Sequence, residues 1–270
     1  MIEQITSPDD PRVAPYREVK EKDLVGRQGL FMAEGEVVLR RLIDTPDMET
    51  VSVLVAQKRL DKLADALAKL PTATPVYVAE PQVLDAVAGF PLHRGMLAIG
   101  RRRASPDARA LLASLPKEAL VLVLVGIANH DNMGGLFRNA AAFGVDAVLL
   151  DATSCDPLYR KAIRVSVGAA LTTPFARIDA EVDLIALLTG EGFTPLALTP
   201  MGATPLARLA RPKRAAVILG AEGPGLPPGL IDRATPVAIP MANNFDSLNV
   251  AVTAGIVLHH LSSVSQQKDR

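Results

Sequence analysis

Apolar runs alternate with amphipathic stretches along the C-terminal half of the chain. Residues 120–128 are almost continuously apolar, which is typical of a parallel strand covered on both faces. The next stretch has helical spacing as far as about Phe143, and Gly144 is well suited to end that helix. Further strands are expected at 147–151, 194–198, 215–219 and 237–240, and further helices at 158–168, 183–188 and 248–262. This alternation predicts an α/β domain with a parallel sheet.

The N-terminal part mixes the two periodicities over shorter stretches. Residues 29–43 predict a short strand that runs into a helix. Strands are expected at 51–56, 76–79 and 96–99, and helices at 60–70 and 82–88. The charged, turn-prone segment 101–108 separates this small α/β unit from the rest. We therefore expect a domain at 1–105, a linker at 106–116 and a second domain at 117–270.

Composition excludes several classes of protein. The chain has 270 residues, of which 49% are hydrophobic, and its 29 basic and 29 acidic side chains cancel. A neutral chain does not coat nucleic acid unspecifically, although a local basic patch is compatible with it. The single cysteine, Cys155, allows no internal disulfide framework. The first residues lack the pattern of a secretory signal, and no apolar run reaches the length of a membrane span. We expect a cytoplasmic protein without a membrane segment.

The first candidate for chemistry is the strand–loop–helix unit IANHDNMGGLFRNAAAFG (127–144). Asn132, Gly134 and Arg138 have the spacing N-x-G-x-x-x-R. Glycines at a helix start let the backbone approach a ligand closely. The alternative is an ordinary surface arginine on a crossover helix.

The second candidate is LGAEGPGLPPG (219–229), which follows an apolar strand. Its glycines surround Glu222, but they do not form the dinucleotide fingerprint G-x-G-x-x-G, and no helix follows directly. The loop still offers backbone hydrogen-bonding groups to a polar ligand. A Pro/Gly turn between two strands is the alternative.

The third candidate is IPMANNFDSLNVAVTAGI (239–256). Five polar side chains immediately precede or enter a very apolar helix: Asn243, Asn244, Asp246, Ser247 and Asn249. Alternatively, Ser247 serves only as the N-cap of that helix, with Asn249 at its second position.

Local charge is the fourth feature. Basic residues gather in three clusters: Arg94 with Arg101, Arg102 and Arg103; Arg160, Lys161 and Arg164; and Arg208, Arg211, Lys213 and Arg214. Each is either a solvated surface or a source of phosphate contacts. The four histidines lack metal-ligand spacing, so we expect no metal.

These segments, in this order, resemble the SpoU (TrmH) family of RNA ribose 2′-O-methyltransferases, part of the SPOUT superfamily. The similar stretches are 129–144, 156–175, 217–226 and 237–256. The resemblance implies a parallel-sheet domain tied into a deep trefoil knot, a homodimer formed through that domain, and S-adenosylmethionine as cofactor. Residues 29–42 are similar to a substrate-recognition domain that resembles certain large-subunit ribosomal proteins.

The resemblance also implies roles for individual residues. Asn132, Arg138, Glu222, Ser247 and Asn249 match the family's functional polar positions. Gly220, Ile239 and Leu248 match positions that hold the adenosine part of the cofactor, and Met241, Leu198 and Thr199 line the same pocket. Arg94, Arg101, Arg102 and Arg103 are expected to contact RNA. The sequence departs from the family at 129–132, where Asn-His-Asp-Asn replaces a common Asp-Pro-Gly-Asn.

The implied reaction is displacement of a methyl group onto a ribose 2′-oxygen of RNA, ribosomal RNA being favoured over tRNA. A guanidinium is almost never neutral in proteins, so we expect Arg138 to bind phosphate and polarise the 2′-oxygen rather than act as the base. The proton would pass to water, to Glu222 or to a transiently neutral Arg138. The main alternative is a non-catalytic RNA-binding or ribosome-assembly factor that keeps the same fold.

Overall fold

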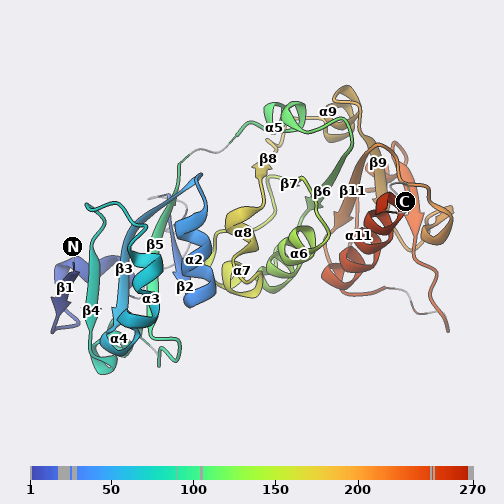
Figure 1. Ribbon diagram of the computed structural model, residues 1–270. Coiled ribbons are helices and arrows are strands. Elements are labelled where there is room, and N and C mark those ends of the chain that lie inside the picture. Colours follow the sequence, from blue (N-terminus) through green and yellow to red (C-terminus); the bar gives the residue numbers. More distant parts are fainter. Residues whose placement is uncertain are drawn as a thin grey trace. The chain divides into compact units, whose positions relative to one another are not determined.

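The computed structural model describes residues 2–17, 25, 29–89, 91–103, 106–243, 245 and 247–266. Internal contacts divide the chain into two compact units. The first comprises residues 1–104 together with 157–172, and the second comprises 105–156 together with 173–270. Figure 1 shows the elements of each unit.

The first unit is built on a five-stranded sheet with the strand order β1-β4-β3-β5-β2. Strands β1, β4 and β3 are parallel neighbours, whereas β5 runs antiparallel to both β3 and β2. The strands are β1 (Ile2–Ile5), β2 (Leu30–Glu34), β3 (Met48–Ala56), β4 (Val76–Ala79) and β5 (Met96–Arg102). The helices are η1 (Pro11–Tyr16), α2 (Glu36–Asp44), η2 (Gln57–Arg59), α3 (Leu60–Leu67), α4 (Pro81–Ala88), α7 (Arg160–Val165) and α8 (Ala169–Thr172).

The second unit contains a seven-stranded sheet in which every neighbouring pair is parallel. The strand order is β10-β12-β9-β11-β6-β7-β8. The strands are β6 (Ala119–Val125), β7 (Ala147–Leu150), β8 (Phe175–Arg177), β9 (Thr194–Leu198), β10 (Thr204–Pro205), β11 (Arg214–Gly220) and β12 (Thr235–Ala238). The predicted α/β fold with a parallel sheet is confirmed.

Helices cover this sheet because its central strands are apolar on both faces. Residues 119–124 of β6 are all buried, as a strand in the middle of a parallel sheet requires. The helices are α5 (Ala108–Ser114), α6 (His130–Ala142), α9 (Leu184–Gly190), η3 (Leu206–Arg208), α10 (Pro228–Ile231) and α11 (Val250–Gln266). Helices α5 and α9 contribute apolar side chains to a common core with alternate residues of β6. Helices α6 and α11 pack against each other.

The segment expected as a linker, 106–116, has a different structure. Asp107 caps helix α5 by accepting hydrogen bonds from the backbone N–H groups of Arg109 and Ala110. Leu111 and Leu112 are buried in the core of the second unit. The local charge of 101–108 indicated a connector, but the apolar side chains that follow it form one face of a short helix and dock onto the sheet.

Residues 157–172 also differ from the expected division of the chain, which placed them within 117–270. They belong to the first unit, where α7 lies against β2 and α8 against α2. Gly168 is a point of close approach to α2. A Cβ atom there would lie 3.1 Å from Cδ of Arg41 and 3.5 Å from Cα of Val38. Sequence proximity suggested the wrong neighbours because this segment gains its packing partners from far away in the chain.

Candidate active site

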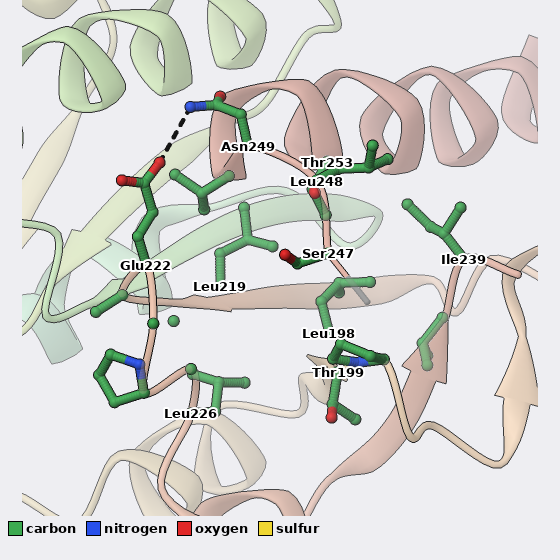
Figure 2. A pocket seen from close by; sticks show the side chains of 18 of the residues that line it. Leu198, Thr199, Leu219, Glu222, Leu226, Ile239, Ser247, Leu248, Asn249 and Thr253 are labelled. Atoms are coloured by element: carbon green, nitrogen blue, oxygen red, sulfur yellow. Dashed lines mark hydrogen bonds between the residues drawn. The ribbon is translucent and has the colours of Figure 1, made fainter. Parts of the chain in front are cut away.

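A cavity of about 650 Å³ opens at the carboxyl ends of strands β9, β11 and β12. In parallel α/β sheets this edge is where ligands bind, because the loops leaving neighbouring strands converge there. The cavity walls are the loops after those three strands and the chain that enters α11, as Figure 2 shows. All six residues expected to hold the cofactor line it: Leu198, Thr199, Gly220, Ile239, Met241 and Leu248.

The loop after β11 can fold here only because of its glycines. A Cβ atom on Gly220 would lie 2.4 Å from the carbonyl carbon of Gly225 and 2.6 Å from the amide nitrogen of Leu226, far inside normal contact. The loop closes with a hydrogen bond of 3.1 Å from the N–H of Gly225 to the carbonyl oxygen of Ala221. Gly223 and Gly225 have φ angles of 89° and 68°, a region that favours glycine. The chain thus turns back sharply and leaves Glu222 at the cavity wall.

Three polar side chains from separate parts of the sequence form one hydrogen-bonded cluster. The Asn132 side-chain amide donates to Oε1 of Glu222 at 2.7 Å. The Asn249 side-chain amide donates to the same oxygen at 3.1 Å and to Oδ1 of Asn132 at 2.9 Å. Asn132 is buried, whereas Glu222 is exposed. Figure 2 shows the bond between Asn249 and Glu222 beside the cavity.

The orientation of this cluster is fixed by the start of α11. Oδ1 of Asn249 accepts hydrogen bonds from the backbone N–H groups of Ala251 at 2.9 Å and Val252 at 3.3 Å. Asn249 is therefore the N-cap of α11, and its amide nitrogen must face Asn132 and Glu222. The alternative assignment of Ser247 as the N-cap is wrong, because the helix begins two residues later than the apolar pattern suggested. Ser247 instead lines the cavity.

Close packing of α6 on α11 brings the two asparagines together. A Cβ atom on Gly135 would lie 2.8 Å from Cβ of Ala251, so the two helices approach each other across small residues. The Asn139 side-chain amide donates to the carbonyl oxygen of Ala251 at 2.6 Å. At the start of α6, Asn129 accepts hydrogen bonds from the N–H groups of Asp131 and Asn132 and caps the helix. The departure from the family pattern at 129–132 thus still supplies a good N-cap.

Arg138 does not join this cluster within one chain. It is exposed on α6 and does not line the cavity. It lies six positions after Asn132, which places the two side chains about 120° apart around the helix at 3.6 residues per turn. The Arg138 side chain makes no hydrogen bond or ion pair with another residue in the described part of the chain. The structure therefore brings together Asn132, Glu222 and Asn249, and leaves Arg138 apart.

A clamp beneath the first loop was not anticipated from the sequence. Oδ1 of Asp151, at the end of β7, accepts hydrogen bonds from the N–H groups of Gly126 at 3.0 Å and Ser154 at 2.9 Å. Oγ of Ser154 in turn accepts from the N–H of Ile127 at 3.0 Å. The signal in the sequence was an Asp followed by Thr153 and Ser154, a pattern typical of an Asx turn. The clamp fixes the chain that leads from β6 into α6 and so to Asn132.

Electrostatics at this clamp keep Asp151 charged. Burial alone would raise the pKa of Asp151, but hydrogen bonds from the Ser154 and Thr153 hydroxyls and from the Gly126 and Ser154 N–H groups outweigh it and lower the pKa. Among the described residues that line the cavity, Glu222 is the one with an ionisable side chain. A cationic ligand group in this cavity would therefore meet one negative charge.

The remaining candidate residues named from the sequence are not part of the Asn132–Glu222–Asn249 cluster. Asn244 and Asp246 lie outside the described residues, and Asn243 adopts a φ of 55°. In the first unit, Arg94 is exposed, and Arg101 forms an ion pair of 3.3 Å with Glu49.

Two searches of the described residues are negative. In the described ranges, His, Cys, Asp and Glu side chains form no group of three or more that could hold a metal ion. None of the helices in those ranges is both long enough and apolar enough to cross a membrane.

Comparison with known proteins finds a matching sequence family and similar proteins. The sequence model of the SpoU rRNA Methylase family matches residues 119–259. An uncharacterized tRNA/rRNA methyltransferase of Mycobacterium bovis is 37% identical over 268 residues, which cover 96% of this chain and 91% of that protein. The 23S rRNA (guanosine-2′-O-)-methyltransferase RlmB of Coxiella burnetii is 34% identical over 176 residues, 63% of this chain and 69% of that protein.

The fold has a counterpart among solved structures. An AdoMet-bound rRNA methyltransferase from Sinorhizobium meliloti superposes with a TM-score of 0.82. The match covers 97% of this chain and 98% of the other at 24% sequence identity. At that identity the likeness shows a shared fold.

Proposed function

The chain belongs to the SpoU rRNA methylase family of RNA methyltransferases, and on this basis we propose that it transfers a methyl group from S-adenosylmethionine to a ribose 2′-hydroxyl of ribosomal RNA. The observation that carries the proposal is the Asn132–Glu222–Asn249 cluster at the wall of the 650 Å³ cavity. The relative from C. burnetii, named for 2′-O-methylation of 23S rRNA guanosine, supports the ribose and the ribosomal target.

The cavity has the properties that S-adenosylmethionine requires. Its volume lies within the usual range of about 300–1,000 Å³ for small-molecule sites. Leu198, Leu219, Leu226 and Ile239 provide apolar walls for a purine, and the backbone around Gly220 offers polar groups. Glu222 would lie near the positive sulfonium. When bound, S-adenosylmethionine supplies an electrophilic methyl group on a good leaving group, so the reaction requires no metal.

The residues of the chain then have separable tasks. Asn132 and Asn249 hold Oε1 of Glu222, which orients this carboxylate beside the cavity. Ser247 and Asn249 would contact the ribose. Arg138 would bind the adjacent RNA phosphate through its planar guanidinium and polarise the 2′-oxygen, while the proton leaves to water or to Glu222. Correct alignment of the reacting atoms is worth up to about 7–11 kcal/mol in favourable cases.

A homodimer formed through the second unit is part of the proposal. Val252 and Ile256 lie one turn apart on α11 and are 52% and 39% exposed, and Leu248, two residues before the helix, is 38% exposed. Such a group of exposed large apolar side chains favours burial against a partner. Arg138 is exposed on α6, which packs beside α11. The trefoil knot, the likeness of residues 1–105 to a ribosomal protein, and RNA recognition by the first unit stay predictions from the family resemblance.

The test uses purified protein, methyl-labelled S-adenosylmethionine, and separate pools of unmodified ribosomal RNA and tRNA. We expect label to enter ribosomal RNA as 2′-O-methylribose and to be lost with Arg138→Ala. Arg233→Ala, which removes an exposed arginine paired with Asp183, is the matched control and should keep the activity. Label only in tRNA would overturn the proposed target. Absence of both methyl transfer and cofactor binding would favour the non-catalytic alternative.

A further inference from the structure

Arginines gather around one strand–helix junction of the first unit, at Glu34 and Gly35. Glu34 ends β2, and its side chain is only 9% exposed. Arg160 of α7 donates to Oε2 of Glu34 from Nη2 at 2.9 Å and from Nε at 3.2 Å. Nη1 of Arg164, one turn later, lies 3.7 Å from the same oxygen. Arg160 therefore satisfies this carboxylate, while Arg164 lies at its edge and stays 44% exposed.

Arg94 approaches the same junction from the turn before β5. A Cβ atom on Gly35 would lie 2.8 Å from both Cδ and Nη1 of Arg94, so the guanidinium occupies the space that the glycine leaves open. Arg94 is exposed, and no hydrogen bond or ion pair links it to a residue in the described ranges. The side chains of Arg94 and Arg164 thus flank two consecutive residues, Glu34 and Gly35.

Arg41 extends this arrangement along α2. Its Cδ would lie 3.1 Å from a Cβ atom on Gly168, the residue four positions after Arg164. Arg41 is half-buried, and within the described ranges it makes no ion pair. Six residues of helix separate it from Gly35, a rise of about 9 Å. We call Arg41, Arg94 and Arg164 the arginine stripe.

Within the arginine stripe, Arg41 and Arg94 differ from Arg12 and Arg40 of the same unit in how their charge is balanced. Arg40 has Asp65 at 2.6 Å and Glu36 at 3.2 Å, and Arg12 has Asp10 at 2.6 Å. In contrast, Arg41 and Arg94 form no ion pair with a carboxylate in the described ranges, and the hydrogen bonds of Glu34, the carboxylate beside Arg164, go to Arg160. Neighbouring like charges repel, and an external polyanion would relieve that repulsion.

We propose that the arginine stripe binds the phosphate backbone of the substrate RNA, with the partly buried Glu34–Arg160 ion pair holding α7 in place. This inference rests on the proposed function, because it takes RNA as the substrate. Guanidinium groups suit this role, since their planar fork matches two phosphate oxygens at once. The surface would be composite, because Arg164 comes from segment 157–172 and Arg41 and Arg94 from the first hundred residues.

The test measures RNA affinity of the full chain as a function of salt. The probe is an unmodified 23S rRNA transcript, and the variants are Arg41→Ala, Arg94→Ala, Arg164→Ala and the triple combination. Each lost phosphate contact lowers the slope of log K against log salt concentration by about 0.7–0.9. We expect that change for each single variant and a change of about 2.1–2.7 for the triple variant. Arg233→Ala should leave the slope unchanged.

Two further measurements separate this role from a structural one. The lysine variant Arg164→Lys keeps the charge and should keep the slope. S-adenosylmethionine affinity, measured by calorimetry, should match wild type in every variant. Wild-type slopes in all three alanine variants, or an equal loss in Arg233→Ala, would overturn the inference and leave the proposed function standing. A wild-type protein that neither binds nor methylates the transcript would instead contradict the proposed function itself.

Discussion

Asn249 performs two tasks that one pair of substitutions can separate. Its Oδ1 caps α11, and its amide nitrogen holds Asn132 and Glu222. Asn249→Ala removes both. Asn249→Asp keeps a capping oxygen, since Asp and Asn are equally good N-caps, but it removes the amide donor and places a second carboxylate where Glu222 accepts.

The expected magnitude for Asn249→Ala follows from these contacts. Loss of an N-cap costs about 0.5–2 kcal/mol. Oδ1 of the buried Asn132 loses the donor at 2.9 Å, and an unsatisfied buried acceptor costs about 1–3 kcal/mol. Because one amide serves both purposes, we expect a combined loss of about 2–4 kcal/mol rather than the sum of the extremes. Asn249→Asp should lose less stability than Asn249→Ala when salt screens the repulsion between the two carboxylates.

Urea denaturation at high salt and methyl-transfer kinetics are the two assays. Misplacing a catalytic group by about 1 Å can cost a hundredfold in rate, so we expect both variants to lose about that much in kcat. Asn249→Asp should nevertheless stay clearly more stable than Asn249→Ala. Equal destabilisation by the two substitutions would refute the capping argument. Full activity of Asn249→Asp would refute the argument that this amide orients Glu222.

Two other predictions concern the loop after β11 and the clamp at Asp151. Gly220→Ala should abolish S-adenosylmethionine binding in calorimetry, because its Cβ would collide with the backbone of the returning loop. Gly229→Ala is the control and should bind normally, because a Cβ atom there meets no atom within 4 Å. Normal binding by Gly220→Ala would show that the loop can open without loss of cofactor affinity. The lowered pKa of Asp151 means that its charged form stabilises the fold above the unfolded-state value of about 3.9, and that this stability is lost as pH falls through the lower folded-state value. Asp151→Asn should therefore be less stable than wild type at pH 7, and the difference should shrink as the pH falls below the unfolded-state value in denaturation experiments. A difference independent of pH would contradict the assignment.

The main elements of both units were predictable from local pattern. The buried run of β6, the helical spacing before Gly144 and the apolar final helix each stand out from polar surroundings. The short edge strands β1, β8 and β10 were not expected, because two to four residues carry too little periodicity to be distinguished from loop. Their extended conformation comes from pairing with a neighbour that is distant in sequence.

The candidate site shows the same division. The resemblance to a known family selected six residues that line the cavity, as well as Asn132, Glu222 and Asn249. It did not reveal that Asn249 caps α11 or that Asp151 clamps the first loop. Both facts depend on where separate loops meet, and helix boundaries are the least certain part of a reading from periodicity.

By itself, the sequence determined the α/β class, the parallel sheet and the set of polar residues available for chemistry, since these follow from local periodicity and from motifs. Only the tertiary structure decided which of those residues meet. Asn132 and Asn249 are 117 positions apart, and the close contact of Gly135 with Ala251 brings them within hydrogen-bonding distance. The same holds for segment 157–172, which packs on β2 and α2 because Glu34 and Gly168 give it partners there. Such long-range packing leaves no periodic signal in the chain.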